Sequence, residues 1–196
     1  MTQTYHHGAL RPALLAAAEA ILDRDGIGGL TLRAAAREAG VSHAAPSHHF
    51  GDITGLLTEL AASGFVRLRT ALEGELAEPH PRKRVQALAR GYVRFARDHP
   101  GVFLLMFRSE RLDWSSPVLS SAGAAAYALL NEGMPEPVAS VDPTGFQTLV
   151  MASTRWSLMH GLATLLVDGR LCAMVEISDA DLERLIEEVI ARGIVG

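Results

Sequence analysis

The stretch Thr31–Phe50, TLRAAAREAGVSHAAPSHHF, decides the fold, because its pattern predicts two short helices joined by a tight turn. Thr31 precedes the first helix, and its hydroxyl can accept a hydrogen bond from an otherwise unpaired amide at the helix start. Gly40 supplies the backbone freedom for a sharp exit. A small residue at Ala36, then the glycine, then an apolar residue at Val41 form a spacing typical of a helix-turn-helix.

The second helix of this unit is expected from His43 to His49, with Ser42 as its capping residue. Pro46 falls in or just after the first turn, where a missing amide hydrogen costs least. A second interpretation stays open on the turn alone, because any helical hairpin can contain a glycine turn followed by a capping serine. The stretch therefore favours DNA binding only together with its surroundings.

The composition favours a helical protein of one large or two small domains. The chain has 196 residues, Ala, Leu and Arg are common, and runs of β-branched residues are scarce. A single cysteine, Cys172, allows no internal disulfide and suits a reducing cytoplasm. No apolar run reaches membrane-spanning length, and the N-terminus lacks the apolar segment of a signal peptide. We therefore expect a cytoplasmic protein with no membrane partner.

The charge balance argues mildly against nucleic-acid binding, since the net charge is −4. Residues 1–56 contain four arginines and five acidic residues, which gives this part a formal charge of −1. The unperturbed pKa of an imidazole is about 6.5, and a nearby phosphate favours its protonated form. The positive charge that faces DNA is therefore expected to depend on pH. Five of the eight histidines lie in this part of the chain: His6, His7, His43, His48 and His49.

Helical periodicity continues on both sides of this unit. Before it, a helix over residues 10–21 is expected to end at Asp25-Gly26, followed by a loop over 27–30. After it, one apolar stripe runs from Ile53 to about Glu75, which predicts a long helix that links two regions. Further helices are expected over residues 85–96, 102–107, 118–131, 144–168 and 182–190, with a proline-containing loop over 133–143.

The last two long helices carry excess apolar surface. Residues 144–168 have few polar side chains around the whole circumference, which predicts burial on more than one side. Gly169 is expected to stop that helix, and Ser178 and Asp181 resemble a capping box before the next one. Excess apolar surface on two terminal helices favours a homodimer built as a helix bundle, with an ordinary monomer core as the alternative.

The N-terminal part of the chain resembles the TetR family of transcriptional regulators. The resemblance rests on YHHGALRPALLAAA at residues 5–18, GLTLRAAAREAGVSHAAP at 29–46, HFGD at 49–52, and Leu56-Leu57. In the C-terminal half, WSLMHG at residues 156–161 resembles the Trp…His-Gly signature of one subgroup.

This resemblance implies an all-α homodimer. An N-terminal three-helix helix-turn-helix domain, residues 1–54, would bind a palindromic operator in double-stranded DNA. A long helix would join it to a helical ligand-binding and dimerisation domain, residues 55–196. The protein would then be a transcriptional regulator, expected to be a repressor, whose operator affinity is controlled by a small, mostly apolar effector.

The resemblance also implies which residues contact DNA. The second helix of the helix-turn-helix would enter the major groove, and the ends of both helices would lie near phosphates. A histidine can donate to guanine, and an alanine can touch a thymine methyl group. The expected DNA-contacting residues are Thr31, Arg33, Ser42, His43, Ala44, Ala45, Ser47 and His48.

Three positions depart from the family pattern. Ser47 stands where the family usually has a tyrosine that donates to the DNA backbone, and Ile53 stands where it usually has a lysine at a helix start. Ala9 stands where an acidic capping residue is common. Lost phosphate contacts lower the affinity for DNA and flatten its salt dependence. A dimeric small-molecule-binding protein that has lost sequence-specific DNA binding is therefore the second hypothesis.

A second group of residues fits a cavity for a mostly apolar molecule. Trp156 and His160 are four residues apart, so they share one face of a helix. Aromatic rings and methionines with one histidine and a few hydroxyls are typical of such cavities. The alternative is that these side chains form an ordinary core. The expected ligand-binding residues are Phe103, Met106, Phe107, Phe146, Leu149, Ser153, Trp156 and His160.

The motifs argue against other chemistries. Gly26, Gly28 and Gly29 complete no nucleotide-binding spacing, and no strand is expected before them. The histidines lack the carboxylate or cysteine spacing of a metal site, so neither a metal nor a cofactor is expected. The sequence has no GxSxG, HExxH or CxxC motif, so the chain is not expected to be an enzyme.

Overall fold

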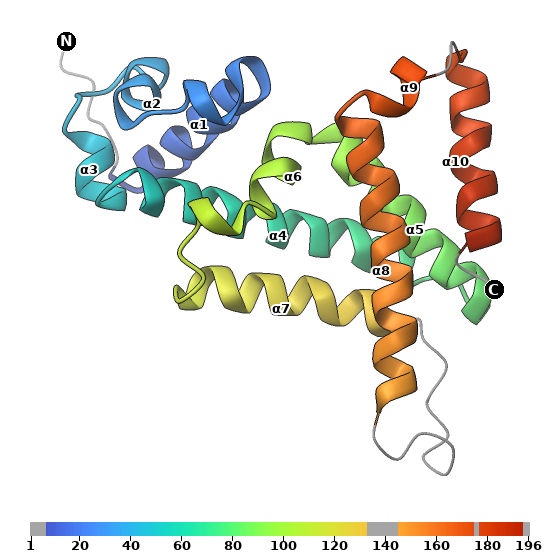
Figure 1. Ribbon diagram of the computed structural model, residues 1–196. Coiled ribbons are helices and arrows are strands. Elements are labelled where there is room, and N and C mark those ends of the chain that lie inside the picture. The colour runs from blue at the N-terminus through green and yellow to red at the C-terminus, as the bar shows by residue number, and fades with distance from the viewer. Residues whose placement is uncertain (1–6, 133–144, 175–176, 194–196) are drawn as a thin grey trace. The chain divides into compact units, whose positions relative to one another are not determined.

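The computed structural model describes residues 7–132, 145–174 and 177–193, and every regular element in these ranges is a helix (Figure 1). The all-α expectation is therefore confirmed. The predicted loop over residues 133–143 lies outside the described residues. The helices are α1 (His7–Gly29), α2 (Leu32–Glu38), α3 (Ala45–Phe50), α4 (Ile53–Glu75), α5 (Pro81–Asp98), α6 (Pro100–Met106), the 3-10 helix η1 (Ser109–Arg111), α7 (Pro117–Glu132), α8 (Phe146–Val167), α9 (Arg170–Met174) and α10 (Asp179–Gly193).

The chain divides into two compact units. The first contains residues 1–66 and 99–123, and the second contains residues 67–98 and 124–196. The division falls inside α4 and inside α7. The domain boundary expected after residue 54 concerns function rather than packing, and it stays a prediction.

The first unit is built around α1, which contacts α2 and α6. Leu14, Ala18 and Ile21 recur at helical spacing on α1 and are at most 1 % exposed. The helix breaks at Gly26, whose φ of +68° suits a residue without a Cβ. The predicted helix end at Asp25-Gly26 is thereby confirmed. Residues 27–29 form a further helical turn where a loop was expected.

Glycines set two helix crossings in the first unit. The Gly101 amide donates to Oδ1 of Asp23 at 3.1 Å, and a Cβ on Gly101 would lie 3.0 Å from the main-chain carbonyl carbon of Leu22. α6 also approaches α4 at Gly64, where a Cβ would lie 2.5 Å from Cγ1 of Val102. Larger residues at either glycine would push the helices apart.

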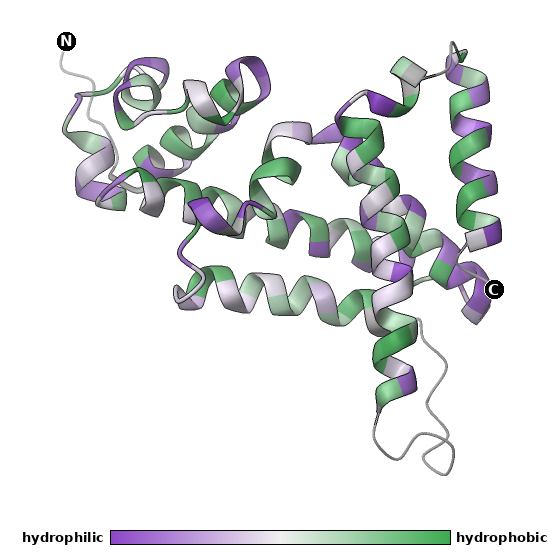
Figure 2. Ribbon diagram, in the orientation of Figure 1, coloured by the Kyte–Doolittle hydropathy of each residue, from purple (hydrophilic) through white to green (hydrophobic). Residues whose placement is uncertain are grey.

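The second unit is built around α5, which contacts α8 and α10. Its sequence, PRKRVQALARGYVRFARD, alternates apolar and charged residues at helical spacing, and Figure 2 shows α10 with the same division into green and purple faces. Leu88, Tyr92 and Ala96 of α5 are at most 2 % exposed. Ile186 and Ile190 of α10 are also buried. These residues form the core of the unit.

α8 is buried on one side in this chain, whereas burial on more than one side was expected. Ala152 and Met159 are 8 % and 4 % exposed, but Phe146 and Leu149 are 60 % and 58 % exposed. The expectation was wrong for the single chain, because composition does not distinguish a face that the chain covers itself from a face left open. Among the described residues, no helix is long and apolar enough to cross a membrane.

The predicted helix ends of the second unit are confirmed. Gly169 directly follows the C-cap of α8 and has a φ of +67°. Ser178 Oγ accepts a hydrogen bond from the Asp181 amide at 3.2 Å and donates to Asp181 Oδ2 at 2.7 Å. The first bond is the predicted cap of α10, whereas the Asp181 carboxylate accepts from the Ser178 hydroxyl instead of the Ser178 amide used in a full capping box.

Candidate functional site

The helix-turn-helix of the first unit consists of α2, the turn at Gly40, and α3. Thr31 Oγ1 accepts a hydrogen bond from the Ala34 amide at 3.0 Å, so the predicted cap of α2 is confirmed. Gly40 has a φ of +67°. The Val41 amide then returns to the Ala36 carbonyl at 3.0 Å. The turn therefore has the small residue, the glycine and the apolar residue in the order that the sequence predicts.

α3 begins at Ala45, two residues later than expected, and Ser42 does not cap it. Ala44 occupies the cap position without a side-chain hydrogen bond, and its carbonyl accepts from the His48 amide at 3.2 Å. A cap at Ser42 would need the amide of residue 46 to close the first helical turn, and Pro46 has no amide hydrogen. Pro46 therefore explains both the later start of α3 and the absence of a cap at Ser42.

Seven of the eight residues expected to contact DNA are exposed or partly exposed. The exception is Ala45, which is 9 % exposed because it lies on the side of α3 that is buried together with Pro46 and Phe50. We therefore leave Ala45 out of the candidate interface. The remaining residues are Thr31, Arg33, Ser42, His43, Ala44, Ser47 and His48.

Two of the four arginines in the helix-turn-helix region are held by carboxylates. Arg11 Nε donates to Glu59 at 2.8 Å, and Arg24 pairs with Glu38 at 3.2 Å and with Asp25 at 3.1 Å. Hydrogen bonds and the charges of these carboxylates raise the pKa of Arg11 and of Arg24. The charges of these arginines and of their acidic partners largely cancel one another.

The other two arginines, Arg33 and Arg37, are exposed, and their guanidinium groups form no ion pair or hydrogen bond with any described residue. The sequence predicted a role for Arg33 but missed Arg37, because composition does not show which arginines are already paired. Asp52 Oδ1 accepts from the Gly55 amide at 2.9 Å, so this acid caps α4. Within the described residues, no group of three or more His, Cys, Asp and Glu is placed to hold a metal ion.

The residues expected to bind a ligand fall into two sets. Phe103, Met106 and Phe107 belong to the first unit, where Phe103 and Met106 are at most 1 % exposed. The Phe107 ring contacts the rings of Phe103 and Phe65, with centroids 5.3 Å and 5.7 Å apart. Such contacts are those of a packed core, so they favour the core alternative for this set.

The second set lies on α8 in the second unit. Trp156 and His160 share a face as expected, with ring centroids 5.7 Å apart. The Tyr92 hydroxyl lies 3.0 Å from Nδ1 of His160, and the Trp156 indole donates a hydrogen bond to Tyr92. Sequence reasoning missed Tyr92, although a tyrosine within a buried helical stripe requires a polar partner. The other expected members of the set, Phe146, Leu149 and Ser153, are exposed.

Burial determines the protonation of this aromatic cluster. It raises the pKa of Tyr92, an effect that the hydrogen bond from Trp156 partly offsets, and it lowers the pKa of His160. A neutral phenol and a neutral imidazole therefore share the hydrogen bond at Nδ1 of His160. Trp156, Tyr92 and His160 thus satisfy one another.

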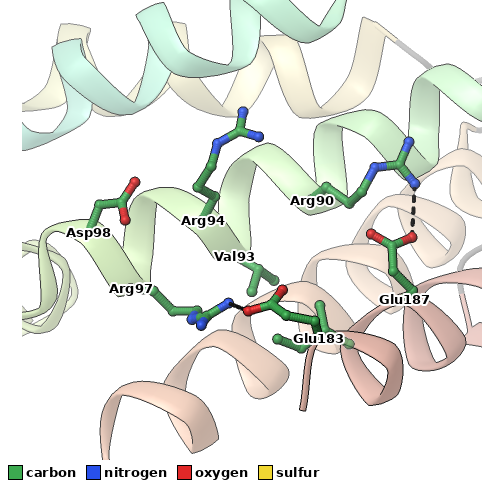
Figure 3. Close-up of a pocket in the computed structure, with 8 residues that line it drawn as sticks. Arg90, Val93, Arg94, Arg97, Asp98, Glu183 and Glu187 are labelled. Atoms are coloured by element: carbon green, nitrogen blue, oxygen red, sulfur yellow. Dashed lines mark hydrogen bonds and ion pairs between the residues drawn. The ribbon is translucent and has the colours of Figure 1, made fainter. Parts of the chain in front are cut away.

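A groove of about 440 Å³ lies between α5 and α10 in the same unit (Figure 3). Two ion pairs cross it, Arg97 with Glu183 at 2.6 Å and Arg90 with Glu187 at 3.3 Å. Arg94 points away from both pairs in Figure 3. None of the expected ligand-binding residues lines this groove. The charged side chains of the groove are largely paired with one another, so they join α5 to α10.

Two family descriptions match the chain. Residues 14–60 match "Bacterial regulatory proteins, tetR family", and residues 85–192, more than half of the chain, match "Tetracyclin repressor-like, C-terminal domain". The chain belongs to the TetR family. The resemblance seen in the sequence is thereby confirmed, while the assignment to the Trp…His-Gly subgroup stays a prediction.

Several relatives share this TetR-family fold. A protein of unknown function from Rhodococcus sp. RHA1 is 39 % identical, covers 100 % of both chains and has a TM-score of 0.77. The TetR family transcriptional regulator PfmR from Thermus thermophilus is 16 % identical over 92 % of this chain and 98 % of its own, with a TM-score of 0.63, so it supports the fold alone. The uncharacterized HTH-type transcriptional regulator YobS of Bacillus subtilis (strain 168) is 26 % identical over 96 residues. That match spans 49 % of this chain and 50 % of YobS, about half the length of this curated relative.

Two departures from the usual TetR-family sequence lie in the helix-turn-helix region. Ser47 is exposed on α3, so no packing requirement explains the serine there. Ile53 is the first residue of α4 and is half-buried. These side chains lack the hydroxyl of the tyrosine and the charge of the lysine that the family resemblance implies at the two positions.

Proposed function

We propose that this TetR-family protein is a homodimeric transcriptional regulator that binds palindromic double-stranded DNA. It acts as a repressor, and a small, mostly apolar effector in the helical C-terminal part controls its affinity for the operator. The proposed site of action is the cytoplasm, where bacterial operators lie. The protein has a binding function and no catalytic one.

One observation carries the DNA-binding proposal: exposed cationic groups near α3 have no acidic partner among the described residues. Arg33 and Arg37 are the permanent charges, and His43 and His48 are also exposed. Phosphate oxygens are the acceptors that such groups lack, and phosphate contacts position a helix-turn-helix on DNA. The formal charge of −1 over residues 1–56 is a poor guide, because four of its five acids are engaged. Asp25 and Glu38 pair with Arg24, and Asp23 and Asp52 accept hydrogen bonds from amides at helix starts.

The dimer proposal rests on the outward faces of α8 and α10. On α8 the exposed apolar residues are Phe146, Leu149 and Val150. On α10, Leu185 and Val189 lie in a shallow groove of about 350 Å³. Apolar surface of this extent on a monomer marks an interaction site.

The charges beside that groove fit a second copy of the chain. Asp181, Arg184, Glu188 and Arg192 line it and alternate in sign along α10. A second α10 placed antiparallel across a twofold axis reverses this order, so that each acid faces an arginine. This complementarity favours an antiparallel α10 contact in the dimer.

The test of DNA binding is a salt titration with the duplex that the protein itself selects from a random pool. The double variant Arg33→Ala/Arg37→Ala should weaken binding and flatten the slope of log K against log salt by about 4, since the dimer loses four phosphate contacts of roughly 0.9 each. Arg82→Ala removes an exposed arginine of α5 and is the matched control. A double variant with the wild-type slope would contradict the proposed surface.

Ser47 and Ile53 favour a second candidate function, a dimeric small-molecule-binding protein without sequence-specific DNA binding. Both residues lack the groups that would contact phosphate. A folded wild-type dimer that selects no duplex but binds a ligand would support this candidate.

A further inference from the structure

Arg155 of α8 carries a charge that nothing in the described chain balances. Its Nη1 atom is buried and has no hydrogen-bond partner. No described carboxylate forms an ion pair with it. By contrast, Arg90 and Arg97 in the same unit are each paired with a glutamate.

The position of Arg155 along α8 shows where a partner would have to lie. It follows Ala152 by three residues and precedes Met159 by four, and these two residues are 8 % and 4 % exposed. Residues at this spacing lie on one helix face, so Arg155 belongs to the inward face of α8. The exposed Phe146 and Leu149 lie elsewhere on the helix, so a second chain docked on them would not supply the missing anion.

A partly buried guanidinium group cannot lose its charge by deprotonation. Burial lowers the pKa of Arg155, but an arginine stays protonated at any physiological pH. A cation withdrawn from water without an anion destabilises a protein, and an apolar side chain of similar size would remove that cost. Natural sequences break such a packing rule mainly at functional sites, where a ligand completes the arrangement.

We propose that Arg155 binds the carboxylate of an organic acid with an apolar body, inside the second unit. The inference rests on the proposed function, because the acid would be the effector of the C-terminal part. One guanidinium group balances the single charge of a carboxylate with paired hydrogen bonds. A phosphate ester would keep a second, uncompensated charge beside apolar neighbours such as Ala152 and Met159.

The other polar groups of this unit that sequence analysis favoured have their partners within the chain. Trp156 donates to Tyr92, and the Tyr92 hydroxyl bonds to His160. The groove between α5 and α10 is crossed by ion pairs. These groups therefore already have partners, whereas Nη1 of Arg155 has none among the described residues.

The test measures binding of hexanoic, octanoic, decanoic and 4-phenylbutyric acids, and of their methyl esters and the matching alkyl phosphates, by calorimetric titration of the full chain at pH 7.5. The wild type should bind at least one acid about tenfold more tightly than its ester and its phosphate, as expected for a charge-assisted pair. Arg155→Gln should lose this preference, and Arg155→Lys should keep part of it. The control Arg170→Gln changes an arginine whose side chain is 74 % exposed and should keep all of it.

Two results would overturn the proposal: a folded wild type that binds none of these acids, or an Arg155→Gln variant that keeps the preference for acid over ester. A second measurement uses Arg155→Leu without ligand. Removing an unbalanced, partly buried charge should raise the melting temperature by roughly 2–4 °C. A lower melting temperature would mean that the guanidinium group is structural, which also overturns the proposal.

DNA binding measured on the same preparations separates this inference from the proposed function. Selection of a palindrome by a protein that binds no acid would overturn the carboxylate site and leave the regulator standing. Arg155-dependent acid binding by a protein that selects no DNA would support the site and count against the regulator.

Discussion

At Pro46 the absence of one amide hydrogen changes the candidate DNA surface. Because α3 begins only at Ala45, Ser42 and His43 lie in the turn rather than in the helix. The Ser42 hydroxyl makes no capping bond, and its side chain is exposed. It therefore stays free to donate to a phosphate, which is the role that the family resemblance implies for it.

Restoring the family residues at Ser47 and Ile53 should strengthen DNA binding. Ser47→Tyr adds a hydroxyl donor, and Ile53→Lys adds a cation at the start of α4. The double variant should bind the selected duplex more tightly, with a salt slope steeper by about 2, since the dimer gains two lysines that each contribute roughly 0.9. Ser47→Phe is the control, since it adds the ring without the donor. Unchanged affinity and slope in the double variant would rule out a phosphate-facing role for both positions.

His160 should make the stability of the fold depend on pH. Burial lowers the pKa of His160 in the folded protein, whereas the unfolded chain binds this proton near pH 6.5 (roughly its ordinary value). The unfolded state therefore binds more protons below that pH, and the contribution to stability is lost as the pH falls from about 7 toward the lowered folded value. Urea unfolding at pH 7.5 and pH 5.5 measures the difference. His160→Gln should reduce it and the exposed His80→Gln should not; an equal pH dependence in wild type and His160→Gln would refute this assignment.

At the scale of elements, two glycines of α4 should respond in opposite directions to the same substitution. A Cβ on Gly64 would lie 2.5 Å from Cγ1 of Val102 and 2.7 Å from Sδ of Met106, so Gly64→Ala should lower the free energy of unfolding by about 1–3 kcal/mol. Gly74 has no atom within 4 Å of that position, so Gly74→Ala should raise it by roughly 0.5–1 kcal/mol. Urea denaturation compares them. Equal effects of the two substitutions would contradict the close crossing of α4 and α6.

Most elements could be predicted from the sequence, because apolar periodicity, glycines and capping residues act locally. The long helix Ile53–Glu75 and the cap at Ser178 are examples. The start of α3 could be predicted only by noting that Pro46 has no amide hydrogen for the first helical hydrogen bond. The contact of Tyr92 with His160 joins residues 68 positions apart, and no local pattern reports such a pairing. The crossing at Gly64 depends in the same way on which helices meet.

At the scale of the molecule, the sequence showed excess apolar surface but not what covers it. The structure places the apolar end of α8 in the open and the aromatic residues of α6 in a core. Of the two sets of expected ligand residues, only the set on α8 contains polar side chains. His160 of that set bonds to Tyr92, whereas the neighbouring Arg155 has a buried atom without a partner. Which polar side chains are left for a ligand depends on charge pairing with residues distant in the sequence. Composition does not show that pairing.

The proposed dimer predicts a charge-reversal rescue on α10. Glu188→Arg places two cations opposite each other in an antiparallel contact and should weaken self-association about tenfold, since two equivalent sites each contribute up to about 1 kcal/mol. The double variant Arg184→Glu/Glu188→Arg again places an acid opposite each arginine in the antiparallel contact and should recover the wild-type dimer. Sedimentation equilibrium measures both. A double variant no better than Glu188→Arg would exclude the antiparallel register.

Selection of random duplex DNA on the purified protein, at pH 6 and at pH 7.5 followed by sequencing, tests the central claim most directly. The account predicts a palindrome, because two symmetric helix-turn-helix units read half-sites roughly 34 Å apart. It also predicts stronger enrichment at pH 6, because a phosphate favours the cationic form of any histidine beside it. No enriched sequence at either pH, from a protein shown to be folded, would contradict the claim that this chain regulates transcription by binding an operator.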